Sequence, residues 1–208
     1  MPRDELKPKK STSDDAARER IVAAARRNFF AKGFRGVTMD DLARELGMSK
    51  KTLYEHFSSK TALVEAAILH KFRGIYAELE RITSGSSSAF PATLHQLLSY
   101  IQQQTGEIQP PFLRDIRRQP EMFNIVESGR REMIQRYLGK LIGRGRKAGV
   151  VRDDVPAELI TEIILGALEK ILNPAKMAEL DITPKAGYAA IIAVILEGVI
   201  TEKGRSQL

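Results

Sequence analysis

Apolar side chains recur at three- and four-residue spacings through most of the chain, which is the pattern of α-helices with one buried face. The first apolar stripe begins after Asp14 and consists of Ala17, Ile21, Ala24, Ala25 and Phe29. Comparable stripes occur at about residues 60–79, 91–105, 112–118, 121–147, 156–172 and 184–203. No stretch of the sequence alternates apolar and polar residues in the way that a half-buried strand does. The pattern predicts an all-α protein.

Residues 33–60 contain helix-boundary signals at close intervals, which divide this part of the chain into short helices. In order, they are Gly33 as a helix end, Thr38 with Asp41 as a capping box, Gly47 as a second helix end and Ser49 as a second cap. The two short helices on either side of Gly47-Met48-Ser49 have the spacing of a helix-turn-helix. In that motif the second helix enters the major groove of DNA, and the first lies across the backbone.

The outward face of the second short helix, residues 50–57, carries groups that suit DNA. Leu53 and Phe57 lie four apart on its buried side. Facing outward are Ser49, Lys50, Lys51, Thr52, Tyr54 and His56, with Lys60 at the start of the next helix. Hydroxyls and helix-terminal amides bind phosphate, and a lysine reaches phosphate or guanine O6 and N7. Singly, each residue is more often a solvated surface group, so the hypothesis depends on their occurring together.

Positive charge is concentrated near the N-terminus. Residues 1–60 contain 14 Lys and Arg against 9 Asp and Glu, whereas the whole chain has 33 against 26. This distribution favours a polyanionic partner for the first part of the chain, although a basic terminus can also be a merely solvated surface. We expect residues 1–13 to form a disordered basic arm, because they are polar, contain Pro2 and Pro8 and have little apolar content.

The stretch from Arg20 to Leu63 resembles the DNA-binding domain of the TetR/AcrR repressor family, over about a fifth of the chain and without gaps. The matching residues are Ile21, Ala24, Ala25, Phe29, Gly33, Phe34, Thr38, Leu42, Ala43, Gly47, Met48, Ser49, Thr52, Leu53, Tyr54, His56, Phe57, Lys60 and Leu63. The resemblance implies that the DNA contacts are made by Thr38, Lys50, Thr52, Tyr54, His56 and Lys60. Lys51 departs from the family, which usually has a small residue there, and this leaves open whether it contacts a base or a phosphate.

The resemblance also implies a divergent helical domain after the helix-turn-helix, with a ligand cavity and a two-helix dimer interface. We therefore expect a three-helix DNA-binding domain at residues 14–60 and a larger helical ligand-binding and dimerisation domain at residues 61–208. The helices predicted at 156–172 and 184–203 are apolar over more than one face, so each can pack inside the protomer and against a partner. A fully internal position is the alternative. The residues expected to face the partner are Ile160, Ile164, Ile192, Ile195 and Val199.

Candidate ligand contacts come from aromatic and polar residues of the middle helices. They are His95, Tyr100, Gln103, Phe112, Phe123 and Tyr137. Each has an ordinary alternative as a core or surface residue, because ligand pockets are few and mostly apolar. Arg114, Arg117 and Arg118 can bind an acidic effector, or they can be solvated or paired with Asp115 and Glu121.

The sequence lacks the motifs of the common enzyme classes. The chain contains no cysteine, and its three histidines do not form HExxH or another metal-ligand spacing. It contains no GxSxG, GxxxxGK[ST] or GxGxxG. We therefore expect no catalytic residues, no metal and no cofactor. The polar N-terminus and the absence of an apolar run of about 20 residues predict a cytoplasmic protein that does not enter a membrane.

These patterns together predict a ligand-responsive transcriptional repressor. It binds a palindromic double-stranded DNA operator as a homodimer, and a small-molecule effector of unknown identity releases it. The two alternatives are an architectural DNA-binding protein without an effector and a small helical enzyme. A large C-terminal domain argues against the first, because bending DNA does not require one.

Overall fold

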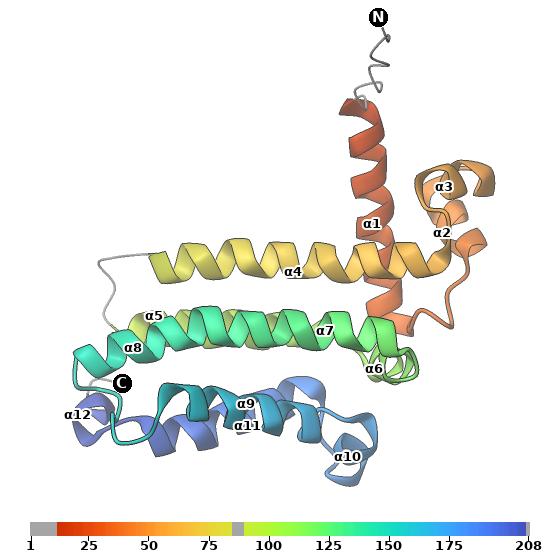
Figure 1. Cartoon of the computed structure of the whole chain (residues 1–208). Helices are drawn as coiled ribbons and strands as arrows, with labels where there is room; N and C mark the ends of the chain where they lie inside the picture. Colours follow the sequence, from red (N-terminus) through yellow and green to blue (C-terminus); the bar gives the residue numbers. More distant parts are fainter. Residues whose placement is uncertain (1–11, 85–89, 207–208) are drawn as a thin grey trace, which may run out of the picture.

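The computed structural model describes residues 12–84 and 90–206 (Figure 1). Of the expected basic arm, residues 1–11 lie outside the described part, and residues 12 and 13 already belong to the first helix. Residues 85–89 also lie outside it. Within the described residues the chain is helical, and its one strand-like feature is an isolated antiparallel pairing of Val151 with Ile200. The predicted all-α fold class is confirmed. None of the described helices combines the length and apolar character needed to cross a bilayer.

The first three helices follow the predicted boundary signals. They are α1 (Thr12–Lys32), α2 (Met39–Leu46) and α3 (Lys50–His56). Thr38 caps α2 in a complete capping box with Asp41, and Gly47 ends α2 in the left-handed conformation at φ 66°. Ser49 caps α3 by accepting a hydrogen bond from the Thr52 amide. These local bonds satisfy the end groups that a short helix leaves open, which is why two helices of two turns form here.

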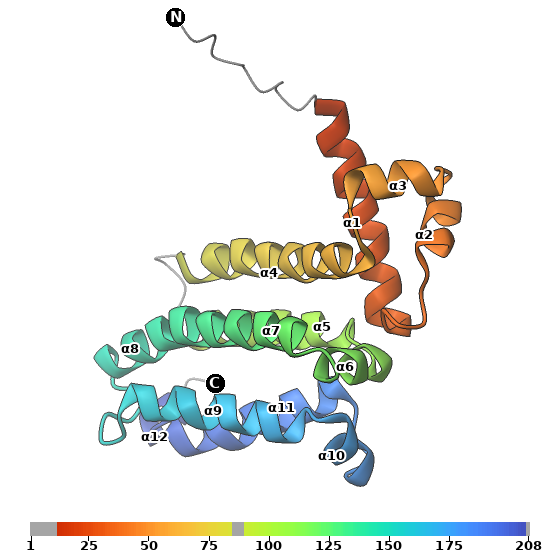
Figure 2. The ribbon, with the colours of Figure 1, turned by 45° about the vertical axis from the view of Figure 1, so that its right-hand side comes forward.

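The long helix α4 (Lys60–Ser84) joins two hydrophobic cores. Its first half, including Leu63 and Ile68, packs with α1, α2 and α3. Its second half, including Ile75 and Leu79, packs in the core of the C-terminal helices. In Figures 1 and 2, α1 crosses one end of α4, and α2 and α3 lie beside that end, away from the rest of the molecule. A movement of α4 therefore displaces the whole N-terminal unit.

The C-terminal helices form two layers beneath α4 (Figure 2). They are α5 (Phe90–Gly106), α6 (Pro110–Arg117), α7 (Pro120–Met133), η1 (Ile134–Leu138), α8 (Gly139–Lys147), α9 (Ala157–Ile171), α10 (Pro174–Glu179), α11 (Pro184–Val199) and α12 (Glu202–Arg205). The helix predicted over 121–147 is interrupted by the π-helical turn η1. The helix predicted over 184–203 stops at Ile200, where the backbone turns extended and the Arg152 amide donates to the Val199 carbonyl. Helix α10 was not predicted.

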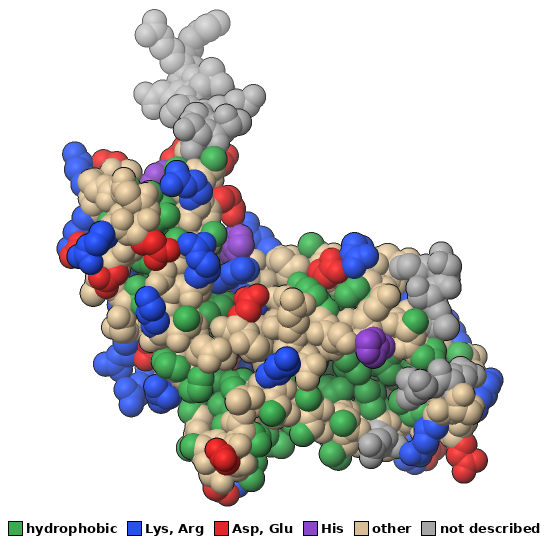
Figure 3. Space-filling view, turned by 180° about the vertical axis from the view of Figure 1, so that it is seen from behind, with side chains coloured by type: hydrophobic (Ala, Val, Ile, Leu, Met, Phe, Trp, Pro, Cys, Tyr) green, Lys and Arg blue, Asp and Glu red, His purple; other side chains and the backbone are tan. Residues whose placement is uncertain are grey.

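The residues expected to face a partner subunit lie instead inside the protomer. Ile160, Ile164, Ile192 and Val199 are each less than a tenth exposed and belong to the C-terminal core, and Ile195 is partly buried against that core. The opposite faces of α9 and α11 expose Leu159, Ile163 and Val194, of which Val194 is 72% exposed. Figure 3 shows hydrophobic side chains gathered over the lower layer of the molecule. These five residues therefore pack within the protomer, which is the internal position given above as the alternative, and the outer faces of α9 and α11 carry other apolar side chains.

Candidate DNA-binding surface and ligand cavity

The helix-turn-helix is held rigidly at its buried side. Leu53 and Phe57 of α3 are at most 2% exposed and pack in the N-terminal core. Helix α2 is fixed to α1 by Glu45, whose carboxylate accepts hydrogen bonds from Arg27 at 2.9 Å and Asn28 at 2.6 Å. These two donors, Asn28 foremost, hold the pKa of Glu45 below its ordinary value. The orientation of α3 on the surface is thus set by packing and by polar contacts from α1.

The exposed face of α3 presents Lys50, Lys51 and Tyr54. The Lys50 ammonium lies 3.0 Å from the carboxylate of Asp40 on α2, and this hydrogen bond raises the pKa of Lys50. Lys51 makes no ion pair with any residue that the structure describes. The α3 face therefore offers one cation already held by a carboxylate and one cation that is ready for an anion.

Two predicted DNA contacts are also structural groups. The Thr38 hydroxyl donates to the Asp41 carboxylate at 2.6 Å and accepts from the Asp41 amide at 3.1 Å, and these bonds hold the pKa of Asp41 low. The His56 ring points toward α1, where Nδ1 lies 3.2 Å from Asp14, and its side chain is 15% exposed. Lys60 is half-buried, and burial lowers the pKa of its ammonium.

Arg18 of α1 is a positioning residue that the sequence did not reveal. Its guanidinium donates to the His56 carbonyl at 2.8 Å, at the end of α3, and lies 4.1 Å from the centre of the Phe57 ring. A cation at a helix C-terminus satisfies an open carbonyl and interacts favourably with the helix dipole. Arg18 therefore fixes the C-terminal end of α3 from a distance of 38 residues along the chain.

A cavity of about 120 Å³ lies in the C-terminal half of the molecule, between α4, α5, α6, α7, α9 and α11. Most of its lining is apolar, for example Ile75, Ile101 and Leu168. Its polar lining residues are Lys71, Gln104, Thr105, Arg130 and Tyr188. A mostly apolar hollow with a few placed polar groups is the usual form of a small-molecule site.

The cations of the cavity differ in how fully they are bonded. The Lys71 ammonium donates to the carbonyl and side-chain oxygens of Gln104, both at 2.9 Å, and to Glu107 at 2.7 Å. Arg130 donates from Nη1 to Glu127 at 2.7 Å. Burial lowers the pKa of both cations, although each has a carboxylate partner.

Three comparisons place the chain among known proteins. Residues 21–67, from α1 to the first turns of α4, match the model of the bacterial regulatory proteins of the tetR family. The helix-turn-helix region of the chain is thus similar to the DNA-binding region of the TetR family. The HTH-type transcriptional regulator UidR of Escherichia coli K12 is 21% identical over 192 residues, which are 91% of this chain and 96% of UidR.

The TetR-family fold extends over the C-terminal half as well. SmeT, the repressor of the Stenotrophomonas maltophilia multidrug efflux pump SmeDEF, has a similar structure with a TM-score of 0.65 and 19% identity, covering 91% of this chain and 93% of SmeT. A transcriptional regulator from Saccharomonospora viridis in complex with choline has a TM-score of 0.65 and 18% identity, covering 90% of this chain and all of that one. At these identities the likeness establishes the fold of this chain and does not identify its ligand.

The six residues predicted from sequence to contact a ligand lie in different environments. Phe112 lines the cavity, and Tyr137 lines a smaller neighbouring hollow. His95 and Gln103 are on the exposed face of α5. Tyr100 and Phe123 are partly buried, Tyr100 against the C-terminal core and Phe123 against the N-terminal one, where the Arg117 guanidinium lies 5.6 Å from the Phe123 ring centre. The polar residues Lys71, Gln104, Arg130 and Tyr188, which line the cavity, were not predicted from the sequence.

Helix α6 connects the cavity to the DNA-binding domain. Its residues Phe112, Leu113 and Ile116 line the cavity. Toward α1, the centre of the Phe112 ring lies 4.5 Å from that of Phe30, which also lines the cavity, and Asp115 accepts a 2.8 Å hydrogen bond from the Arg35 amide. A change in the cavity that moves α6 therefore acts directly on the end of α1.

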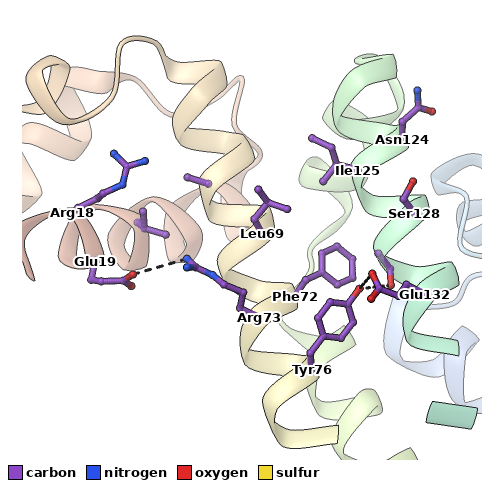
Figure 4. Close-up of a pocket in the computed structure, with 13 residues that line it drawn as sticks. Arg18, Glu19, Leu69, Phe72, Arg73, Tyr76, Asn124, Ile125, Ser128 and Glu132 are labelled. Atoms are coloured by element: carbon purple, nitrogen blue, oxygen red, sulfur yellow. Dashed lines mark hydrogen bonds and ion pairs between the residues drawn. The ribbon is translucent and has the colours of Figure 1, made fainter. Parts of the chain in front are cut away.

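An open cleft of about 730 Å³ lies on the outer side of the same wall, between α1, α4 and α7 (Figure 4). Phe72 lines both this cleft and the inner cavity. Beside it, the Tyr76 hydroxyl donates to the Gly129 carbonyl at 3.0 Å, next to Glu132 (Figure 4). Phe72 is therefore the partition between the interior of the C-terminal domain and the cleft that faces α1.

Proposed function

We propose that this protein is a TetR-family repressor that binds a two-fold symmetric operator as a homodimer and is released by an effector in the inner cavity. The observation that carries the proposal is the helix-turn-helix: α3 is capped and buried on one side, while Lys50, Lys51 and Tyr54 are exposed on the other. Its relatives UidR and SmeT are a transcriptional regulator and a repressor, respectively. This supports the same class of activity here.

In the proposed complex, α3 lies in the major groove and its capped N-terminus faces the DNA backbone. Amides at a helix N-terminus favour an anion, so the first turn of α3 is suited to a phosphate. Lys51 supplies the free charge beside it, and Lys50 exchanges Asp40 for DNA. Ser49, Thr52, Thr38 and Lys60 are proposed as flanking contacts, and His56 is proposed to act only after it leaves Asp14.

The second subunit is proposed to cover the exposed apolar faces of α9 and α11. Leu159 and Ile163 are about half exposed, and Val194 is more exposed than any other large hydrophobic residue described. Large side chains of this kind, on two helices that are already packed inward, are suited to a symmetric four-helix contact. Such a dimer presents two copies of α3 to one side of a DNA duplex.

Release is proposed to follow from a shift between two conformations. The effector has to bind the form that does not fit DNA more tightly, because equal affinity for both forms would shift nothing. Helix α6 and the Phe72 partition are the elements that transmit the change, since each touches the cavity and the surroundings of α1. The Saccharomonospora viridis regulator, which has a similar fold, is in complex with choline, and this supports a small-molecule ligand for the present chain.

Selection of binding sequences from random DNA tests the proposal. The expected result is an inverted repeat whose half-site centres lie about 34–36 Å apart, or a multiple of that distance. Inserting about five base pairs between the half-sites should abolish tight binding, because one half-site then faces the wrong side of the duplex. Recovery of no inverted repeat, or binding that ignores the spacing, would instead favour an architectural role.

A further inference from the structure

The inner cavity offers hydrogen-bond donors to a ligand and almost no free acceptors. Its lining contains two cationic side chains and one tyrosine, and no Asp or Glu is part of it. The remaining polar side chains are engaged, because Gln104 accepts from Lys71 and the Thr105 hydroxyl donates to the Ile101 carbonyl at 2.9 Å. A group that enters the cavity therefore finds donors in an apolar surrounding.

Lys71 is not the donor that a ligand would use. An ammonium has three N–H groups, and those of Lys71 have three oxygen partners within 2.9 Å. One of these partners is the Gln104 carbonyl in the last turn of α5, so Lys71 closes the C-terminus of that helix. Its role is to hold α4 against α5.

Arg130 and Tyr188 do have donors to spare. A guanidinium has five N–H groups, and Arg130 uses the Nη1 group toward Glu127, its one hydrogen-bond partner among the described residues. The Arg130 side chain is 18% exposed. Tyr188 is 8% exposed, and its hydroxyl makes no hydrogen bond with any described residue. This hydroxyl is therefore free to donate to a ligand in the cavity that Tyr188 lines.

We propose that the cavity binds a compact organic monoacid, whose anionic group pairs with Arg130 and takes a second hydrogen bond from Tyr188. This inference rests on the proposed function, because it names the chemical class of the effector. A cavity of about 120 Å³ is close in size to apolar cavities of about 150 Å³ that hold one benzene ring, so the apolar body is at most one ring or a short chain, as in benzoate or hexanoate, with the carboxylate at the wall beside Arg130. A single charge fits better than two, because Arg130 already shares its charge with Glu127.

A cationic ligand does not suit the same lining. It would meet two buried cations without a carboxylate facing it, and like charges repel strongly in an apolar surrounding. A neutral amide of the same shape fits the space but forgoes the charge-assisted bond to Arg130, which is the stronger kind. The three ligand classes are therefore separable by affinity alone.

Isothermal titration calorimetry on the full chain tests this inference with benzoate as the probe. Benzamide, phenyl phosphate and benzyltrimethylammonium are the neutral, dianionic and cationic comparisons. We expect benzoate to bind about 10-fold or more tighter than benzamide, phenyl phosphate to bind more weakly than benzoate, and the cation not to bind, because hydrogen bonds to charged groups contribute more than neutral ones. Equal affinities for benzoate and benzamide, tighter binding of the cation, or no binding of benzoate or hexanoate would overturn the inference.

Variants assign the contacts. Arg130→Gln should weaken benzoate about 10- to 100-fold and leave benzamide nearly unchanged, and Tyr188→Phe should weaken benzoate about 2- to 10-fold. Arg131→Gln is the matched control, because Arg131 is the next residue of α7 but its side chain is 52% exposed and bonds Glu162. Unchanged benzoate binding in Arg130→Gln would overturn the assignment. If Arg130→Gln does not fold, Arg130→Lys keeps the charge and should show an intermediate loss.

The inference and the proposed function fail in different ways. If benzoate binds through Arg130 but does not release the selected DNA, the carboxylate-binding site at Arg130 is supported and release by an effector is contradicted. Release of that DNA by neutral ligands of the same size, with Arg130→Gln responding like the wild type, would support effector release and overturn the carboxylate-binding site.

Discussion

At the scale of the residue, Asp40 determines how much of the charge on α3 is available to DNA. Its carboxylate lies 3.0 Å from the Lys50 ammonium, and both side chains are 54% exposed. An exposed pair of this kind is weak in solution, so a DNA phosphate can replace the carboxylate. The carboxylate nevertheless competes with the phosphate and repels it. In the proposed complex, Asp40 therefore limits the affinity of α3 for DNA.

Asp40→Asn should consequently strengthen DNA binding by about 3- to 10-fold at low salt, because it removes both the competitor and a negative charge near the backbone. If Lys50 then takes a phosphate, the slope of log affinity against log salt should steepen by about one. Fluorescence anisotropy with the selected operator measures both quantities. Asp153→Asn, an exposed position in the loop before α9, is the matched charge control. An unchanged affinity and slope in Asp40→Asn would show that Lys50 faces away from the DNA.

At the scale of the element, the boundaries of α2 and α3 could be predicted because their signals are local. Thr38, Gly47 and Ser49 act within a few residues of the helix ends that they define. The π-helical turn after Met133 has no such signal, and neither does the break of the last long helix at Ile200, which depends on a backbone bond to Arg152. Local sequence signals thus determine the helix boundaries of the DNA-binding unit more completely than those of the C-terminal helices.

The cavity could not be predicted in the same way, because its lining depends on which helix faces meet. Gln103 is exposed, whereas the adjacent Gln104 bonds Lys71 and lines the cavity. Arg130 and Tyr188 lie on different helices far apart in the sequence, and only the packed fold brings them to one space. The apolar stripes of α9 and α11 show the same limit, because a helix that is apolar on two sides does not reveal which side is internal.

The contact of α4 with α7 gives a test at this scale. A Cβ atom on Gly129 would lie 2.6–2.8 Å from the Phe72 ring, whereas one on Gly74 of α4 would meet nothing within 4 Å. Gly129→Ala should therefore destabilise the protein by about 1–2 kcal/mol, since overpacking exceeds the gain in helix propensity. Gly74→Ala should stabilise it by about 0.5–1 kcal/mol. Urea unfolding measures both variants.

Gly129→Ala also tests whether the Phe72 ring separates the cavity from the cleft. The Phe72 ring is the movable group in that contact, and it also lines the cavity. A ring displaced inward leaves less room, so benzoate should bind more weakly to Gly129→Ala than to Gly74→Ala. Equal stability and equal benzoate affinity in the two variants would mean that the Phe72 ring moves freely and does not separate the cavity from the cleft.

At the scale of the whole molecule, buried tyrosines link stability to alkaline pH. Burial raises the pKa of Tyr76 to about 12 and raises those of Tyr137 and Tyr188 as well. In the unfolded chain these groups ionise near pH 10, so above that pH the unfolded state loses protons that the folded state keeps. Their contribution is therefore intact below about pH 10 and is lost as the pH rises toward the folded values.

We expect the urea midpoint to fall between about pH 10 and pH 12, and the fall to be smaller in Tyr188→Phe. Absorbance at the tyrosinate band, followed against pH, should show part of the tyrosine signal ionising late in the native protein and all of it near pH 10 in urea. If the native and unfolded titrations coincide, these rings are open to solvent, and Tyr188 does not lie in a sheltered cavity wall.

The proposed homodimer depends on the outer faces of α9 and α11. Val194→Asp places a charge on the most exposed large apolar residue of α11, where the proposed partner would bury it. An unpaired buried charge costs about 3–5 kcal/mol, so the dissociation constant should rise by more than about 100-fold and sedimentation velocity should show monomers. Leu180→Asp is the control, because Leu180 is 46% exposed at the end of α10 and lies outside this face. The Val194→Asp protein should keep its helical circular dichroism, since the side chain makes no core contact. As a monomer it should bind the complete operator only as weakly as the wild type binds a single half-site. A Val194→Asp protein that remains dimeric and still prefers the complete inverted repeat would place the subunit interface on another surface.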